Sequence, residues 1–521
     1  MNTTRRRFLH AVAGTTALGL VDVPSLRGLA AIAAERPTGT VRFGSDIEPI
    51  VRLIEETPRE RCVSVFIDQL RRGLPYRRFL AAAFFAGIRK TRSHHDVYKI
   101  HSVHDVSMAV RPEDRLLPLF WAIDAFKERQ QRQEDSPAPL MAELKSTLPA
   151  PEKAAAEFRA AMQSFDLDRA EPALVAMAHS LGARQTMEEL WQYGCRNGGA
   201  GGHSAIVVAN CFRALETIGW QHAEPVLRFV LQDWFAFGWQ KPDQSCLPNI
   251  ARVDQHLDKL SPSWSGDKGN PAATQELFAL LREGQADAAI ELTVKQLQDG
   301  ITAQAIWDAV HLATAELMVR HRSGWGLASR PLHSNTSTNA LHYAFRTCTS
   351  SRTRLLVLLQ AVAWAASRTA GDLASKDLRD IRITELAGSS VPASSEDAVA
   401  EIFAQLPTRS YFWDNKTKQA ELTYGERADA DEGCRKVFAL IKERPEASPL
   451  FVQTAVSWLC RKASLDHHEY KFLAAILEDA TLVSPEWQPH LLAASVHYFH
   501  GQQTPDNPVV QQAREALLKT E

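Results

Sequence analysis

Two histidines three residues apart are the first residues whose types and spacing suit a chemical role. His101 and His104 lie in KIHSVHDVSMAVR (99–111), among small and apolar residues. In a helix, positions i and i+3 share a face, so both imidazoles can reach one metal ion. The chain has 18 histidines, and ordinary surface or core histidines also produce such a spacing. The pair becomes informative only if related segments carry a histidine at the same position.

The elements that would position these histidines recur four times along the chain. Each segment opens with an apolar helix that ends at glycine or proline, and continues with a second helix, a histidine-containing helix and a last helix introduced by turn residues. The predicted repeats span about 44–132, 153–240, 272–385 and 396–500. Linkers rich in proline, glycine and serine separate them. Apolar residues recur at helical spacing and period-two runs are nearly missing, so we expect an all-α fold of four related multi-helix units, stacked or closed around a central site.

Histidines fall at matching points of these units. HSVHDVSMAVR (101–111) aligns without a gap with HSAIVVANCFR (203–213), and HSNTSTNALHYAFR (333–346) fits with one extra helical turn. Histidines at equivalent points of units packed around one axis converge on one central volume. We therefore expect His101, His203 and His333 to face one another, with His104 one turn further along the same helix face. Neutral imidazoles suit a borderline first-row ion such as iron or zinc.

Other histidines are weaker candidates for such a site. The fourth segment, HHEYKFLAAILED, matches HDVYKIHSVHD of the first through a shared His, Tyr and Lys. In the adjacent pairs His94–His95 and His467–His468, at most one member of each is expected to face inward. His311 lies within an apolar helix and is interpreted as a core residue. His342 lies about half a turn around the helix from His333, so we do not expect it to share the site.

Several other residues near the histidines have types that suit a site. Candidate acids and bases are Asp96, Asp105 and Tyr98, and Asp105 alternatively orients a ligand imidazole. The glycine-rich run 198–202, directly before His203, would let the backbone approach closely and leave room for a substrate; the alternative is a flexible loop. The chain has no G-x-S-x-G, H-E-x-x-H or G-x-x-x-x-G-K-[ST] motif, so these hydrolase and nucleotide-binding classes gain no support.

The amino-terminal residues MNTTRRRFLHAVAGTTALGLV join an arginine cluster to a short, mildly apolar run. This order predicts a twin-arginine signal peptide over residues 1–34, and hence a periplasmic or exported protein whose single all-helical domain spans 35–521. Many cargoes of this pathway load a metal or cofactor before crossing. No later apolar run has membrane-spanning length, so we expect no membrane span.

Charge and cysteine content give no support to several further classes of function. The chain has 59 basic and 61 acidic side chains, a formal charge of -2, which does not suggest a nucleic-acid partner. Its seven cysteines are scattered without a C-x-x-C pair, so zinc-ribbon, thioredoxin-like and c-type haem sites gain no support. The odd number argues against a complete disulfide framework and leaves one or two bridges open.

The histidine motifs resemble those of a known family. HSVHDVSMAV, HSAIVVANCFRALE and HSNTSTNALHYAFR resemble, in order and approximate spacing, the three histidine motifs of questin oxidase-like proteins. The resemblance implies an α-helical oxygenase, cofactor-free or with non-haem iron, that acts with dioxygen on polycyclic aromatic ketones. It also implies the metal ligands His101, His104, His203 and His333.

Three functions remain as hypotheses from the sequence. The first is an exported oxygenase that binds non-haem iron through its histidines and acts on a small-molecule substrate, an aromatic or polycyclic ketone. The second is a helical-repeat binding or scaffold protein whose histidines are incidental. The third is a zinc-dependent hydrolase, which needs the same ligands and a metal-bound water.

Overall fold

The fold is helical apart from one small antiparallel hairpin. The computed structural model describes residues 39–89, 94–132, 140–322, 329–414, 419–464 and 466–519. Within them, the only paired strands longer than an isolated bridge are β1 (Arg409–Asp414) and β2 (Gln419–Tyr424), in a register that pairs Arg409 with Tyr424. The predicted all-α class is confirmed. The predicted signal peptide, residues 1–34, lies outside the described residues.

The helices form four successive groups of five, which confirms the prediction of four multi-helix units. The first group is α2 (Glu48–Glu56), α3 (Cys62–Arg71), α4 (Tyr76–Arg89), α5 (His94–Ala109) and α6 (Leu117–Arg132). The second is α7 (Pro151–Ser164), α8 (Leu167–Ser180), α9 (Gly182–Gly194), α10 (His203–Ile218) and α11 (Ala223–Phe237). The third is α13 (Pro271–Arg282), α14 (Ala286–Gln298), α15 (Ala303–Arg320), α16 (Ser329–Thr347) and α17 (Ser351–Ala374). The fourth is α18 (Ser395–Gln405), α19 (Arg427–Glu443), α20 (Ser448–Lys462), α21 (His468–Leu482) and α22 (Gln488–Ser495).

Two further helices lie outside the four groups, and glycines with a positive φ lie in the turns after two of the helices. α12 (Cys246–His256) lies between the second and third groups, and α23 (Pro508–Leu518) follows the fourth. Gly73 and Gly300 follow α3 and α14 with φ of +93° and +90°. Glycine adopts this left-handed conformation readily, so it ends a helix and turns the chain back toward the next one.

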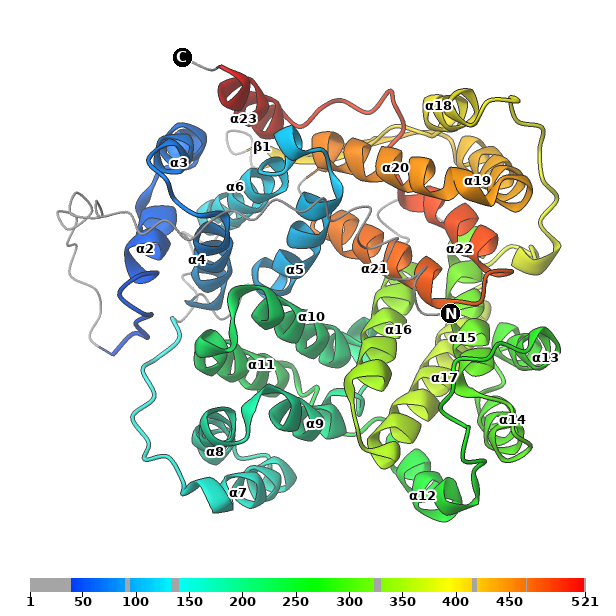
Figure 1. Cartoon of the computed structure of the whole chain (residues 1–521), viewed down its shortest axis with the longest axis horizontal. Helices are drawn as coiled ribbons and strands as arrows, with labels where there is room; N and C mark the ends of the chain where they lie inside the picture. The colour runs from blue at the N-terminus through cyan, green and yellow to red at the C-terminus, as the bar shows by residue number, and fades with distance from the viewer. Residues whose placement is uncertain are drawn as a thin grey trace.

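The fourth helix of each group lies at the centre of the molecule. α5 packs against α10, α10 against α16, α16 against α21, and α21 against α5, so the four helices form a closed ring. Figure 1 shows these four helices at the centre of the view, with α2, α7, α13 and α18 at the periphery. The units are therefore closed around a centre, as one of the two predicted arrangements requires. We call α5, α10, α16 and α21 the central helices.

Burial explains why the helices close in this way. In α10 every residue except Glu216 and Thr217 is buried, and every residue of α15 is buried. A helix that is apolar on most of its surface must be covered on all sides, and no single unit can supply that cover. Trp191, Trp234 and Trp307 are fully buried and belong to this core.

The structure also shows the state of the cysteines and the character of the helices. All seven cysteines are buried free thiols. In the part of the chain that the structure describes, no helix combines the length and the apolar character that a membrane crossing requires.

The packing of α22 on α19 predicts a pH-dependent contribution to stability. His490 lies between the rings of Phe438 and Trp487, with centroid distances of 4.9 and 5.5 Å, and its burial lowers its pKa to about 4. In the unfolded chain a histidine titrates near pH 6.5, so below that pH the unfolded state binds the extra proton. The stabilisation from His490 is therefore complete above pH 6.5 and is lost as the pH falls toward 4. Between pH 6.5 and 5 this loss is about 2 kcal/mol.

The measurement is the midpoint of thermal unfolding at pH 7 and pH 5. The drop on acidification should be smaller in His490→Gln than in the wild-type protein. His179→Gln, which replaces an exposed histidine, serves as the control and should keep the wild-type drop. An equal drop in His490→Gln and wild type would contradict the assignment.

Candidate metal centre

Five histidines form a ring where the central helices begin. His95 lies in the first turn of α5, His203 is the first residue of α10, His333 lies near the start of α16, and His467 and His468 are the N-cap and first residue of α21. Around the ring, the centroid distances are 3.8 Å (95–467), 4.4 Å (467–468), 4.9 Å (468–333), 4.8 Å (333–203) and 5.7 Å (203–95). We call these five residues the histidine ring.

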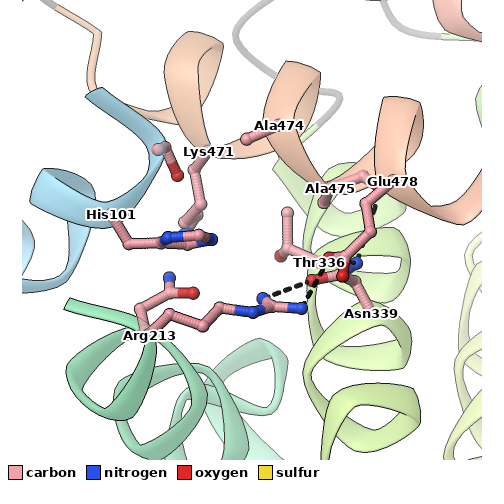
Figure 2. Close-up of a pocket in the computed structure, with 10 residues that line it drawn as sticks. His101, Arg213, Thr336, Asn339, Lys471, Ala474, Ala475 and Glu478 are labelled. Atoms are coloured by element: carbon pink, nitrogen blue, oxygen red, sulfur yellow. Dashed lines mark hydrogen bonds and ion pairs between the residues drawn. The ribbon is translucent and has the colours of Figure 1, made fainter. Parts of the chain in front are cut away.

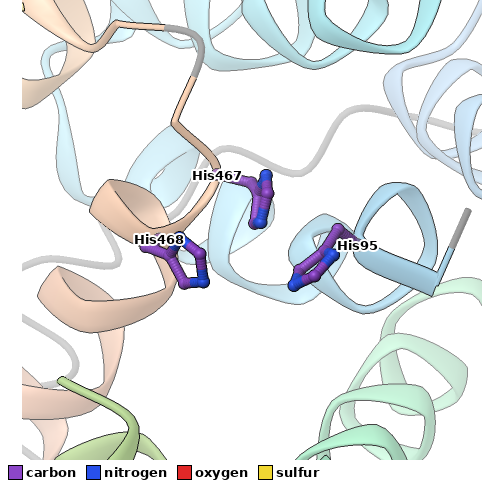
Figure 3. Close-up of side chains that lie close together, drawn as sticks. All are labelled: His95, His467 and His468. Carbon is purple, nitrogen blue, oxygen red and sulfur yellow. The ribbon is translucent and has the colours of Figure 1, made fainter. Parts of the chain in front are cut away.

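Three members of the histidine ring have the spacing of metal ligands. His95, His467 and His468 each offer one nitrogen, and these nitrogens all lie within 4.8 Å of one another. Figure 3 shows His95 on α5 facing the start of α21, from which the other two project. All three side chains are half-buried. Three imidazoles match the number of protein ligands in catalytic metal sites.

A half-buried carboxylate orients His468. Its Nδ1 lies 2.6 Å from Oδ1 of Asp466, and the hydroxyl of Tyr498 donates to Oδ2 of the same carboxylate at 2.9 Å. Burial alone would raise the pKa of Asp466, but the His468 ring and these hydrogen bonds hold it below its usual value. With its Nδ1 hydrogen donated to Asp466, His468 presents the lone pair of Nε2. Carboxylates often hold metal-binding histidines in this way.

His467 is held from the opposite side by an arginine. Nη2 of Arg129 lies 3.3 Å from Nδ1 of His467, and Asp96 in turn holds Nε of Arg129 at 3.1 Å. Burial, followed by the neighbouring His468 and Arg129, lowers the pKa of His467 well below its usual value, so the ring is neutral. Nε2 of His467 is buried and has no hydrogen-bond partner among the described residues. If Arg129 donates a hydrogen bond to Nδ1, the ring proton lies on Nε2. An ion can then bind Nε2 only after the proton moves to Nδ1 and Arg129 releases Nδ1.

The other two members of the ring contact different surroundings. His203 stacks on Trp239 at 5.2 Å, and Trp239 stacks on the exposed Phe237 at 4.7 Å. Nε2 of His333 lies 3.4 Å from Nζ of Lys471, one turn along α21 from His468. Burial lowers the pKa of Lys471 to about 7, although Asp466 opposes this effect. One side of the ring is therefore aromatic and the other carries an amine.

The glycine-rich run before His203 brings two chain segments into close contact. A Cβ at Gly201 would lie 2.7 Å from Cβ of His333, and a Cβ at Gly202 would lie 2.6 Å from Cβ of Ser337. Both glycines also have a positive φ, of +80° and +77°. Only residues without a side chain fit here, so the close backbone approach expected from the sequence is present.

The structure brings together two of the four histidines named from the sequence as ligands. His203 and His333 are neighbours in the ring, whereas His101 and His104 lie elsewhere on α5. His101 is about 9 Å further along the helix than His95, and its Nε2 lies 3.0 Å from Oδ2 of Asp105. His104 is about half a turn around the helix from His95, with Nδ1 3.2 Å from the hydroxyl of Tyr76 on α4.

His95, His467 and His468 were not predicted as ligands. The expectation that at most one of His467 and His468 faces inward is wrong, because both rings belong to the histidine ring and their centroids lie 4.4 Å apart. The useful signal was the match of His95 and Lys99 with His467 and Lys471. That match gives the correct register, whereas the gapless match of His101 with His203 is about two helical turns out of register.

A second histidine pair lies in the core. Nε2 of His311 is 2.8 Å from Nδ1 of His342, and Oδ2 of Asp479 is 3.5 Å from Nδ1 of His311. Burial lowers the pKa of His311 to about 3. His311 is thus a buried core residue, and His342 belongs to this pair.

The comparisons with known proteins add no family to this geometry. No family model, no curated protein and no solved structure matches the chain. The resemblance to questin oxidase-like proteins therefore stays a prediction from the three motifs.

The contact between Gly201 and His333 predicts an unequal effect of two matched substitutions. Gly201→Ala and Gly182→Ala both place a side chain at a positive φ, of +80° and +76°. At Gly182 nothing lies within 4 Å of the added Cβ, whereas at Gly201 the added atom meets His333. We expect Gly201→Ala to cost about 1–3 kcal/mol more than Gly182→Ala, which thermal unfolding of the two variants measures. Equal destabilisation would show that the loop does not press on His333.

Proposed function

We propose that this protein is a metal-dependent oxidoreductase, an oxygenase that binds non-haem iron through His95, His467 and His468. The observation that carries the proposal is the approach of three imidazole nitrogens to within 4.8 Å of one another in a half-buried group. The proposal keeps the reaction class and the metal expected from the sequence, with ligands chosen from the geometry.

The donor set fits a first-row ion. Imidazole nitrogen is a ligand for iron, zinc and copper, and burial lowers the pKa of His467, which favours the neutral form of this ring that binds metals. Iron held there would supply one-electron chemistry with dioxygen. Asp466 supports this use of the site, because it fixes the direction of His468 and adds negative charge beside the ion.

The remaining members of the ring would act on the substrate side. His203 and His333 lie next to the three ligands in the ring, so we assign them the positioning of dioxygen or substrate. The aromatic stack of His203, Trp239 and the exposed Phe237 supports an aromatic substrate on this side of the ring. Nζ of Lys471, 3.4 Å from His333, is placed to donate a hydrogen bond on this side.

Export by the twin-arginine pathway is part of the proposal. Seven buried free thiols are consistent with a chain that folds in a reducing compartment, as cargo of this pathway does before it crosses. The arginine cluster at residues 5–7 supports the same proposal.

Metal analysis of matched histidine variants tests the site. The wild-type protein, produced with iron available and purified without chelator, should contain about one iron per chain. His95→Ala, His467→Ala and His468→Ala should each lose most of the metal. His104→Ala, on the same helix as His95 but facing Tyr76, is the control and should retain it.

Three outcomes would change the proposal. If the wild-type protein contains no metal, the hypothesis of a binding or scaffold protein remains and the metal proposal falls. Zinc, together with ester or amide hydrolysis and no oxygen consumption, would favour the hydrolase. Loss of iron in His104→Ala but not in His468→Ala would return the site to the region of His101.

The hydrogen bond between Asp466 and His468 predicts an effect on affinity. Asp466→Asn keeps the shape of the side chain but removes the charge that holds the Nδ1 hydrogen of His468. We expect metal affinity to fall about 10- to 100-fold, as measured by competition with a chromogenic chelator. Asp105→Asn, which changes the carboxylate beside His101, is the matched control. An unchanged affinity in Asp466→Asn would mean that His468 does not bind the ion.

A further inference from the structure

Arg129 contacts one of the three histidines that have the spacing of metal ligands. It lies on α6, and its Nη2 is 3.3 Å from Nδ1 of His467 at the start of α21. A guanidinium has five N–H donors and no lone pair, so it can only donate a hydrogen bond. Nδ1 of His467 is therefore the acceptor, and the single N–H hydrogen of this ring lies on Nε2.

This contact and a metal ion exclude each other at His467. An ion on Nδ1 would take the lone pair that accepts the hydrogen bond from Arg129. An ion on Nε2 would require the ring hydrogen on Nδ1, where it would face an N–H group of Arg129 with no acceptor between them. Whichever nitrogen binds the ion, Arg129 must move away from His467.

A buried carboxylate keeps Arg129 within reach of His467. Oδ2 of Asp96 lies 3.1 Å from Nε of Arg129, and Oδ1 of Asp96 accepts from Nζ of Lys99 at 2.7 Å. The side chains of Asp96 and Lys99 are 1% exposed, whereas that of Arg129 is 26% exposed. Asp96 therefore holds Arg129 at Nε, and the end of this partly exposed side chain can turn toward solvent without breaking the ion pair.

A second basic side chain, Lys471, contacts a different histidine of the ring. Its Nζ lies 3.4 Å from Nε2 of His333, which is not one of the three residues with ligand spacing. Figure 2 shows Lys471 beside His101, across a small polar pocket from Arg213. Lys471 therefore lies on the side of the ring that we assign to substrate, whereas Arg129 contacts a ligand nitrogen.

We propose that Arg129 is a latch on the metal site, which competes with the ion for His467. When the ion binds Nε2, Arg129 turns away and the ring hydrogen moves from Nε2 to Nδ1, so His467 remains neutral. Because the latch must open before His467 can bind, it lowers the affinity of the site for every cation and raises the metal concentration at which the site fills. The latch rests on the proposed function, since it requires His467 as a ligand, but the hydrogen bond itself requires no metal.

Nitrogen-15 NMR of metal-free protein with labelled histidine tests the contact. His467→Gln identifies the signals of His467. In the wild-type protein we expect the ring hydrogen on Nε2 and a hydrogen-bonded Nδ1, and Arg129→Leu should move the Nδ1 signal downfield. Lys99→Met removes another cation from Asp96 and should leave this signal in place. A hydrogen on Nδ1 in the wild-type protein would overturn the proposal, as would an unchanged Nδ1 signal in Arg129→Leu.

Titration with Co²⁺, whose visible absorption reports coordination, measures the competition. Arg129→Leu and Lys99→Met each remove one positive charge beside Asp96, but only Arg129→Leu removes the hydrogen bond to His467. We expect Arg129→Leu to bind Co²⁺ about 3- to 10-fold more tightly than Lys99→Met and the wild-type protein, as the loss of one hydrogen bond implies. Arg129→Gln, whose shorter side chain does not reach His467, should show the same gain if Arg129→Leu proves too unstable to assay.

The two readouts separate failure of the latch from failure of the metal site. Equal Co²⁺ affinities in Arg129→Leu and the wild-type protein would overturn the latch and leave the three ligands in place. No Co²⁺ binding by any variant, together with a hydrogen-bonded Nδ1 in the wild-type protein, would remove the metal site and with it the role of Arg129 as a latch.

Discussion

The closed packing of four buried helices is the constraint on which the rest of the structure depends. α5, α10, α16 and α21 each pack on two of the others, and none of them has a polar face wide enough to turn to solvent. Each unit therefore needs its neighbours for cover, as in other repeat proteins, but here the array closes on itself. Closure brings equivalent ends of the four helices to one point. A residue type that recurs at the start of these helices becomes a cluster in space, and this places five imidazoles together although their sequence positions span 95 to 468.

Electrostatics determines what this cluster can bind. The amino end of a helix carries partial positive charge, and the central helices begin together at the histidine ring. Arg129 and Lys471 lie there, and burial together with these neighbours lowers the pKa of His467. Neutral imidazoles are metal ligands, but a bound cation would be opposed by the same positive field. Asp466 and the buried Asp96 lie beside the ring and supply the compensating negative charge.

The fold could be predicted from the sequence because it depends on patterns that survive divergence between repeats. Apolar spacing and the glycines that end helices are visible in each unit, and they define the four groups of helices. The convergence of His203 with His333 follows from the same repeats. The position of His95 does not, because the sequence offers two registers: HSVHDVSMAVR matches HSAIVVANCFR, and HDVYKIHSVHD matches HHEYKFLAAILED. The two registers differ by six residues, which is about 120° around a helix, so they place different side chains toward the centre. His467 and His468 both belong to the histidine ring although neighbouring positions of a helix point about 100° apart, and helical spacing alone does not predict this.

The site is less symmetric than the scaffold that holds it, and this difference assigns separate roles to the units. Units one and four supply the three histidines with ligand spacing, together with Asp466 and Arg129, which orient them. Units two and three supply His203 and His333, whose contacts are an aromatic stack and an amine. Four identical units would have surrounded an ion evenly and left no open position. Because the imidazoles of units two and three have other contacts, one half of the ring can hold an ion while the other half faces a substrate. Divergence of the repeats is thus what turns a symmetric core into a candidate active site.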